Sequence, residues 1–377
     1  MSHTAGVSSH LPARAAEVSV EAELERLSEV AAGHARASRA PNTLRAYKSD
    51  WTRFARWCAT HQLSALPAQP LSVAQYLAAA SIERTVAGAW AYAPATMARW
   101  MAAVAWRHHL VGELSPTDDP KVTTVLAGIR RERKRPPRRV LPLVTDDVRT
   151  LIQGMDFSHW PAGVKSARDA AAILFGYAGA MRRSEIAALS VGDIAWDGHD
   201  GLQITINSSK TDQVGEGALV ALPFGQSPTT CPPCVWVRWL DLLANADQGR
   251  LPVLQRVLQT TAPTRWEHVC RQAQMPDVDP GRPLFPLVHR TGRIGADPLT
   301  GNGLTAMVQT RVTTILGRPG EYGWHSLRAG FVTQARRNKA DNTSIRRQTR
   351  HTSDAMLDVY DRRHNPLEGN AVAALGL

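Results

Sequence analysis

Residues 347–361 read RQTRHTSDAMLDVYD and place His351 nine residues before Tyr360. In one unbroken helix, nine residues make about two and a half turns, so these two side chains would face opposite ways. Any cooperation between them therefore requires a break in the helix. Ser353 is a good N-cap and Asp354 follows it in what would be a first turn, which predicts such a break at the centre of the stretch.

The composition limits the class of protein. The chain has 377 residues, which favours two domains, each with a core of its own. Its hydrophobic content of 44% and charged content of 20% are typical of a soluble globular protein. The formal charge of +11 and the pI near 10.0 favour a polyanionic partner, with nucleic acid first and a membrane surface second. An Arg-rich soluble protein without such a partner is the alternative.

The sequence also predicts a compartment. It shows no signal segment at its start and no apolar run long enough to span a bilayer, so we expect a cytoplasmic protein. Four cysteines form no disulfide framework, which favours a reducing compartment. Cys231 and Cys234 form a CxxC motif, but we expect His268 and Cys270 to lie too loosely to complete a zinc site. We therefore predict no metal and no cofactor.

A strongly basic segment, RRERKRPPRRVLPL at 130–143, separates two halves of different character. Its two prolines prevent a continuous helix. The predicted organisation is a disordered N-terminus (1–17), a helical domain (18–130), a basic linker (131–143) and a second domain (144–377) with a C-terminal tail (366–377). Apolar periodicity predicts the helices of the first domain at 18–38, 43–62, 72–83, 94–110 and 119–131.

Basic residues in this half are candidate DNA-binding residues. They lie on the helix that we expect Pro41-Asn42-Thr43 to cap and in the linker: Arg45, Lys48, Arg130, Arg131, Arg133, Lys134, Arg135, Arg138 and Arg139. A solvated linker is the plainer interpretation of the charge run. Four tryptophans, Trp51, Trp57, Trp100 and Trp106, are expected in the core rather than as base-stacking platforms.

The second half is predicted to be mainly helical around a small hairpin. Leu202, Ile204 and Ile206 alternate with polar residues before a polar, Gly-rich turn, which is typical of a β-hairpin. One helix is predicted to begin after a Thr145 cap, and a second, buried helix is predicted to end at Gly179. Further helices are expected at 234–245, 302–317, 325–338, 343–350 and 354–361, whereas residues 246–280 show no strong pattern and are interpreted as a surface insertion.

Four stretches of this half carry residues suited to a single chemistry. AMRRSE (180–185) supplies an arginine, SKTDQ (209–213) a lysine at the hairpin turn, HSLR (325–328) a histidine and an arginine on one helix face, and the final stretch a histidine and a tyrosine. The candidates are Arg182, Lys210, His325, Arg328, His351 and Tyr360, with Glu185 in support.

This set meets the requirements of transesterification of a DNA phosphodiester without a metal. A phenol has a pKa near 10, so it needs a base or positive surroundings to attack at neutral pH. Guanidinium groups suit the charge that develops on the non-bridging oxygens, and a mobile lysine can protonate the leaving oxygen. Each residue alone has an ordinary alternative, such as a salt bridge for Arg182 or a core position for Tyr360. Their joint occurrence favours catalysis.

In this order the motifs resemble those of the tyrosine recombinases of the phage-integrase family. That family has an Arg-x-Ser-Glu box, a hairpin lysine, a His-x-x-Arg and a histidine nine residues before the nucleophilic tyrosine. The adjacent Arg182 and Arg183 are distinguished only by the register of Ser184 and Glu185. CPPCVWVRWL resembles the Cys-Pro-led helix that follows the hairpin in many members. One departure is Arg350, where family members usually have glycine, and it would alter the turn or add a phosphate contact.

The resemblance implies a mainly α fold with a small β-sheet (α+β). An all-α core-binding domain and a catalytic domain would form a C-shaped clamp on double-stranded DNA. It implies a 3′-phosphotyrosine on Tyr360, a homo-tetramer on DNA, and a bacterial, phage or plasmid origin. Monomers or dimers in solution and accessory DNA-bending proteins stay open, as does docking of the tail in cis or in trans.

Two rival functions remain at this stage. A type IB topoisomerase or hairpin telomere resolvase would use the same residues to relax or close DNA. A non-catalytic DNA-binding protein of the same fold would not need Tyr360. A function at a membrane surface is disfavoured, because the basic residues do not form one amphipathic helix.

Overall fold

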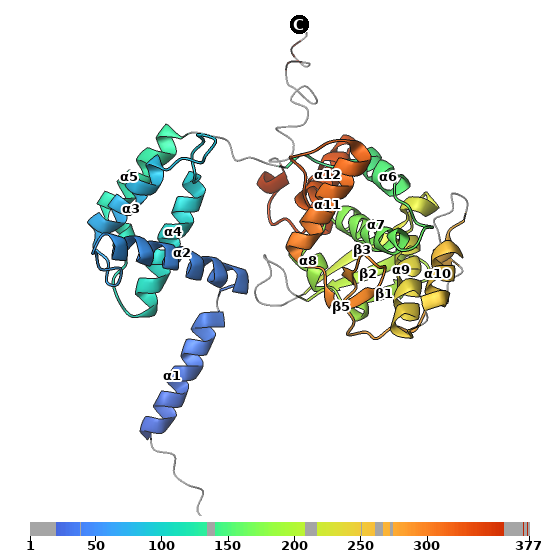
Figure 1. The fold of residues 1–377 in the computed structure, drawn as a ribbon, viewed down its shortest axis with the longest axis horizontal. Coiled ribbons are helices and arrows are strands. Elements are labelled where there is room, and N and C mark those ends of the chain that lie inside the picture. Colours follow the sequence, from blue (N-terminus) through green and yellow to red (C-terminus); the bar gives the residue numbers. More distant parts are fainter. Residues whose placement is uncertain are drawn as a thin grey trace, which may run out of the picture. The chain divides into compact units, whose positions relative to one another are not determined.

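The structure is a computed structural model, and the chain divides into two compact units, residues 1–136 and 137–377 (Figure 1). It describes residues 20–37, 39–133, 140–207, 217–249, 251–260, 267–271, 274–357, 372 and 375. The fold class is confirmed as mainly helical with small antiparallel sheets. None of the helices in these ranges is both long enough and apolar enough to cross a membrane.

Most helices of the first unit start at prolines. Four α-helices and one 3-10 helix have proline in the first turn, where its missing N–H costs nothing. The elements are α1 (Val20–Ala37), α2 (Pro41–Thr60), α3 (Pro70–Ile82), α4 (Pro94–Leu110), η1 (Pro116–Asp118) and α5 (Pro120–Glu132). Their core contains Phe54, Tyr76 and Trp100, with Trp51 and Trp57 packed against it. Trp106 is half-buried and its ring lies 5.9 Å from that of Tyr47.

Two predicted helix caps are wrong. α2 begins at Pro41 itself, with Ala40 as N-cap and no side-chain cap; the proline, at the first helical position, has no N–H that would need a partner. α6 (Thr145–Gln153) already includes Thr145, whose hydroxyl bonds the Tyr177 hydroxyl at 2.7 Å. The backbone N–H of Val144 donates instead to Asp147 at 3.1 Å.

The second unit surrounds one large core. Its helices are α6, α7 (Ala162–Ala178), α8 (Arg183–Ala188), η2 (Val191–Asp193), η3 (Pro228–Thr230), α9 (Pro232–Asp247), α10 (Leu251–Thr260), η4 (Val269–Arg271), α11 (Gly301–Leu316), α12 (His325–Arg337) and α13 (Asn342–Thr349). α7 and α9 are buried along most of their length and contact each other. The prediction of a patternless insertion at 246–280 is wrong over α10, where Leu254 and Leu258 are buried in the core.

Two antiparallel sheets complete this unit. One has the strand order β1 (Ile194–Asp197), β2 (Gly201–Ile206) and β3 (Ala218–Pro223), and the other pairs β4 (Pro286–Val288) with β5 (Ile294–Pro298). Leu202, Ile204 and Ile206 are buried while the residues between them are exposed, which confirms the predicted alternation in β2. Strands β1, β4 and β5 were not predicted, since runs of three to five residues carry little periodic signal.

Close contacts hold α12 against the rest of the second unit. A Cβ on Gly330 would lie 1.7 Å from the carbonyl oxygen of Leu143, so only glycine fits there. Likewise, a Cβ on Gly176 would lie 2.4 Å from the Trp324 ring. The Trp324 indole N–H donates to the carbonyl of Met181 at 2.9 Å. The start of α12 is thereby fixed beside the residue that precedes Arg182.

Candidate active site

Arg182 and Glu185 form the first part of the site, at the start of α8. Arg182 is the N-cap residue, and its backbone N–H donates to the Glu185 carboxylate at 2.7 Å. Its guanidinium donates to the other carboxylate oxygen, also at 2.7 Å. Glu185 is only 3% exposed, so this carboxylate is held rigidly. Arg183 instead turns outwards and bonds Asn302, which agrees with the choice of Arg182 from the sequence.

A second arginine reaches the same carboxylate from the C-terminal end of α13. Arg350 follows α13 in the left-handed region, with φ 57° and ψ 42°, where glycine is the usual residue. Its guanidinium donates to Glu185 at 2.6 Å and to the carbonyl of Gln348 at 3.1 Å. Of the two alternatives for Arg350, an altered turn is not seen at this residue, because it adopts the left-handed conformation that glycine favours. The other alternative, a phosphate contact, stays a prediction.

Arg328 joins the two loops that carry these arginines. It lies one turn after His325 on α12 and is almost completely buried. Its guanidinium donates to the carbonyl of Ala180, at 2.5 Å, and to that of Thr349. Since Ala180 precedes Arg182 by two residues and Thr349 precedes Arg350 by one, Arg328 fixes the spacing between the two loops.

His325 and His351 lie close to these cations. Burial, followed by the charges of Arg328 and Arg182, lowers the pKa of His325. Burial also lowers the pKa of His351 to about 3, with further contributions from Arg328, Arg182, His325 and Arg350. Both imidazoles are therefore neutral at pH 7 in the absence of a bound anion. The mutual electrostatic effects show that all five groups share one site.

A hydrogen-bond chain defines the tautomer of His351. The Thr349 hydroxyl donates to the carbonyl of Ile345 at 2.7 Å, so it can only accept from His351 Nδ1, which lies 2.9 Å away. Nδ1 of the neutral ring therefore carries the proton, and Nε2 is the basic nitrogen. Thr349 was not identified from the sequence, although its position two residues before His351 is a local signal.

The charges of the described part of the site do not cancel. Arg182 and Arg350 pair with one carboxylate, that of Glu185, and Arg328 donates to two backbone carbonyls, so these four groups carry two net positive charges. Buried cations need anionic or hydrogen-bonding partners. A phosphate group matches this need in charge and in its capacity to accept bonds from guanidinium forks.

Two predicted catalytic residues, Lys210 and Tyr360, lie outside the described residues. The segment between α13 and Tyr360 does show the predicted break: α13 ends at Thr349, and residues 351–353 are not helical before helix resumes at 354–357. Leu357, three residues before Tyr360, is fully buried. It packs with Val332 and Ile345 in a small cluster separate from the main core.

The candidate DNA-binding residues of the first unit differ in their surroundings. Lys48, Arg130 and Arg131 are exposed, and Arg45 is exposed and bonds Asn42. Arg133 is half-buried, lies over the Trp90 ring at 3.8 Å and donates to the carbonyl of Tyr92. Lys134, Arg135, Arg138 and Arg139 lie outside the described residues, as do most of tail 366–377 and the whole of segment 1–17.

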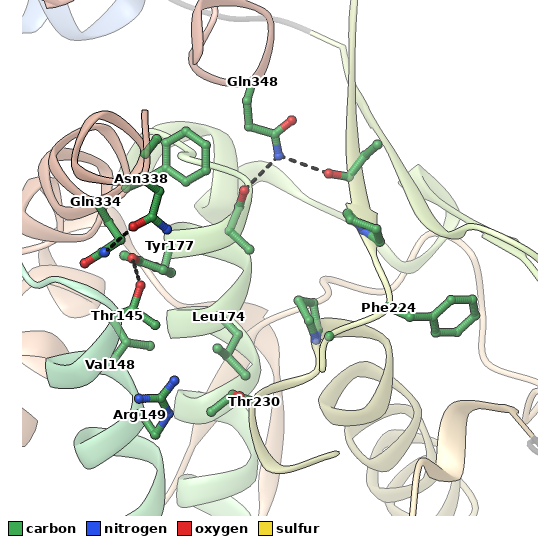
Figure 2. A pocket seen from close by; sticks show the side chains of 17 residues that line it. Thr145, Val148, Arg149, Leu174, Tyr177, Phe224, Thr230, Gln334, Asn338 and Gln348 are labelled. Carbon is green, nitrogen blue, oxygen red and sulfur yellow. Dashed lines mark hydrogen bonds between the residues drawn. The ribbon is translucent and has the colours of Figure 1, made fainter. Parts of the chain in front are cut away.

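A largely apolar pocket of about 660 Å³ opens beside the site, between α6, α7, β3, α12 and α13 (Figure 2). Tyr177 and Phe331 contribute aromatic rings to its wall. Gln348 lines it as well, and its amide donates to the carbonyls of Ala178, at 2.7 Å, and Ala221, at 3.0 Å. Gln348 thus joins α7, β3 and α13 two residues before Arg350.

One negative expectation about the cysteines is wrong. His268 and Cys270 were expected to lie too loosely to meet the CxxC motif, but the fold brings all four ligand atoms within 4.8 Å of one another. The ligands belong to α9 and to η4, and α10 stands between these two elements in sequence. No local spacing in the sequence could show that the two segments meet.

Comparison with known proteins finds similarity to integrases and site-specific recombinases. No family model matches the sequence. The integrase/recombinase xerD homolog of Selenomonas ruminantium is 27% identical over 352 residues, covering 92% of this chain and 89% of the relative. The structure of lambda integrase (75–356) as a dimer bound to a COC′ core site superposes with a TM-score of 0.51 at 15% identity, covering 90% of this chain and 94% of that one. The XerH recombinase bound to palindromic difH gives a TM-score of 0.46 at 13% identity, covering 86% and 76%.

Proposed function

We propose that this chain, a tyrosine recombinase by sequence and by fold, cuts and rejoins double-stranded DNA at specific sites with Tyr360 as the nucleophile. The observation that carries the proposal is the pairing of Arg182 and Arg350 with the buried Glu185 carboxylate, next to Arg328, which bonds the two loops that carry them. Two neutral histidines lie beside these cations. Such a cluster fits a phosphodiester, whose negative charge increases in the transition state.

Each step uses groups of this chain. The Tyr360 oxygen attacks the scissile phosphorus, the bond to the 5′-oxygen breaks, and Lys210 gives that oxygen its proton. Nε2 of His351 is the basic nitrogen nearest in sequence to the nucleophile and accepts its hydrogen. Rejoining reverses these transfers with the 5′-hydroxyl of the partner strand. The phosphotyrosine retains the bond energy, so strand transfer itself uses no nucleotide cofactor.

Arginines and Glu185 have separate tasks in this scheme. Arg182 and Arg328 stabilise the non-bridging oxygens of the phosphate. The carboxylate of Glu185 holds the Arg182 guanidinium in a fixed orientation. His325 stands one turn before Arg328 and, as a neutral ring, donates one hydrogen bond to the phosphate. The positive field at the site also attracts the DNA backbone, as do the exposed basic residues of the first unit.

Strand exchange between two sites needs four protomers on DNA, and we assign the contact between protomers to the C-terminal tail. Val372 and Leu375 expose more than half of their apolar surface. The pocket of about 660 Å³ beside the site offers an apolar seat for this segment from a second copy. Deletion of 366–377 should weaken tetramer assembly on DNA more than binding to a single site. An unchanged tetramer in native gels would refute docking in trans.

Covalent trapping tests the chemistry and does not require a known target sequence. Protein is incubated with sheared host DNA without added magnesium and denatured with SDS, and the DNA that stays attached is sequenced. We expect adducts at one recurring, roughly palindromic sequence for the wild type and for a matched control, Tyr322→Phe. Tyr360→Phe and Arg328→Ala should give none while still binding DNA.

The other outcomes separate the rival functions. Adducts scattered without sequence preference, together with relaxation of supercoiled plasmid, would favour a topoisomerase. A hairpin product from one site would favour a telomere resolvase. Adducts that persist in Tyr360→Phe would remove Tyr360 from its role. If the wild type binds DNA but yields neither adduct nor recombinant product, a non-catalytic DNA-binding protein would be the better description.

A further inference from the structure

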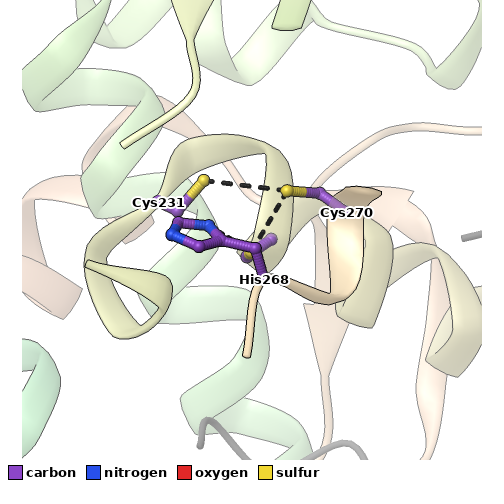
Figure 3. A group of neighbouring side chains, drawn as sticks. Cys231, His268 and Cys270 are labelled. Carbon is purple, nitrogen blue, oxygen red and sulfur yellow. Dashed lines mark hydrogen bonds between the residues drawn. The ribbon is translucent and has the colours of Figure 1, made fainter. Parts of the chain in front are cut away.

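A cluster of three cysteines and one histidine lies at the N-terminal end of α9 (Figure 3). Cys231 is the N-cap residue of α9, and Cys234 lies within its first turn. His268 and Cys270 come from the segment that forms η4. All three thiols are buried and His268 is half-buried. This group is separate from the arginine cluster, whose residues belong to α8, α12 and the end of α13.

The four ligand atoms all lie within 4.8 Å of one another, close to the spacing of a tetrahedral metal site. The Cys234 sulfur lies 3.3 Å from the Cys270 sulfur and 3.5 Å from Nδ1 of His268. The Cys231 and Cys270 sulfurs are 4.0 Å apart. Zinc–sulfur bonds of about 2.3 Å in a tetrahedron imply sulfur–sulfur separations of about 3.8 Å. The thiols are thus neither at disulfide distance nor spread as unrelated core residues would be.

A buried arginine supplies the second observation. Arg238 follows Cys234 by one helical turn on α9 and is only 4% exposed. Among the residues that the structure describes, none accepts a hydrogen bond from any of its three guanidinium nitrogens. Residues four apart lie on the same face of a helix, so the cation lies on the side of α9 that carries Cys234. A buried guanidinium needs an anionic or hydrogen-bonding partner there.

A zinc complex supplies the charge that Arg238 requires. Zn²⁺ with three thiolates and one neutral imidazole carries one net negative charge, whereas three protonated thiols carry none. The backbone N–H of Gly225 also donates to the Cys231 sulfur at 3.2 Å, which is the bond that a metal-bound thiolate accepts. A Cβ on Gly225 would lie 2.7 Å from the Cα of Cys231, so glycine permits this approach.

We propose that Cys231, Cys234, His268 and Cys270 bind one Zn²⁺ ion as a structural site. Four protein ligands fill a tetrahedral shell and leave no position for substrate, so the ion has no part in strand transfer. It joins the start of α9 to the segment beyond α10 and closes a loop of the chain from 231 to 270. This closure holds α10 and η4 against α9, which they both contact.

Metal content tests the proposal directly. The full-length protein is produced with zinc in the medium, purified without chelators, and measured by mass spectrometry of the metal. We expect about one Zn²⁺ per chain. The double variant Cys234→Ser/Cys270→Ser should lose at least nine-tenths of it. Cys58→Ser removes a cysteine that is equally buried but lies in the first unit, and it should keep the full amount.

A second measurement does not depend on variants that fold poorly. Wild-type protein stripped of metal by a mercurial reagent and reduced again is titrated with Co²⁺, whose tetrahedral thiolate complexes absorb visible light. An absorption that saturates at one equivalent and vanishes on addition of Zn²⁺ supports the site. If the zinc-free wild-type protein shows no visible absorption on titration with Co²⁺, the proposed metal site is wrong. So would a mass two hydrogens lower than that of the reduced chain, with a disulfide mapped between two of these cysteines.

Discussion

Replacement of Arg350 by glycine and by alanine separates what its backbone contributes from what its guanidinium contributes. Both variants delete the ion pair with Glu185, and only alanine keeps a Cβ in the left-handed conformation at φ 57°. A Cβ in that conformation costs about 1 to 2 kcal/mol. Loss of a hydrogen bond to a charged group costs about 1.5 to 3 kcal/mol. Glu185 retains its two bonds to Arg182, so the carboxylate is not left unpaired.

The expected order of stability is wild type, then Arg350→Gly, then Arg350→Ala. Because relief of the backbone offsets the lost bond, the effect on the glycine variant should lie between a gain of about 0.5 kcal/mol and a loss of about 2 kcal/mol. Alanine should lie about 1 to 2 kcal/mol below glycine. Urea-dependent hydrogen exchange of peptides from α12 and α13 measures this in the second unit alone. Equal stability of the two variants would refute the left-handed end of α13. A glycine variant more stable than the wild type by more than about 0.5 kcal/mol would show that the Glu185 bond contributes less than about 1.5 kcal/mol.

Three further predictions concern other parts of the molecule. The pKa of His351 is about 3 in the folded chain, below its ordinary 6.5, so the unfolded chain binds a proton first as the pH falls. The free energy of unfolding should therefore decline between about pH 6.5 and pH 3, by up to about 1.4 kcal/mol per pH unit. Denaturant unfolding at several pH values should show a shallower decline for His351→Gln, whereas His109→Gln should decline as the wild type does. Gly330→Ala drives a Cβ to 1.7 Å from the carbonyl of Leu143 and should cost about 3 kcal/mol or more, seen as a lower urea midpoint; an unchanged midpoint would contradict the packing of α12. Lys48→Ala should reduce the slope of log affinity against log salt by about 0.9 if the lysine contacts a phosphate, and an unchanged slope would exclude that contact.

Local patterns in the sequence predicted much of the site. His325 and Arg328 share a helix face because they are three residues apart, and the break before Tyr360 follows from Ser353 and Asp354. Such features depend only on neighbours in the chain. The fold class likewise follows from helical periodicity, since the long helices α2, α4, α7 and α11 carry it over many residues.

Contacts between distant segments could not be predicted in this way. Arg350 and Glu185 are 165 residues apart, and only the packing of α13 beside α8 makes them partners. Cys234 and Cys270 are 36 residues apart, with α10 between them. His268 and Cys270 stand close together as a second half-site would, which is a local signal for metal ligands, although it does not show that they meet Cys231 and Cys234. The unusual spacing of this half-site makes the signal weak in the sequence alone.

The small cluster of Leu357, Val332 and Ile345 has a consequence for the timing of the reaction. It links the segment before Tyr360 to α12 and α13 through three fully buried side chains, apart from the main core. A segment anchored by so few apolar contacts opens locally at a free energy below that of global unfolding. The main core and the arginine cluster can therefore stay assembled while this segment detaches and returns. Under the proposed function, the local opening of residues 351–357 would be an equilibrium of its own, separate from global unfolding, and it would govern when Tyr360 can act as the nucleophile.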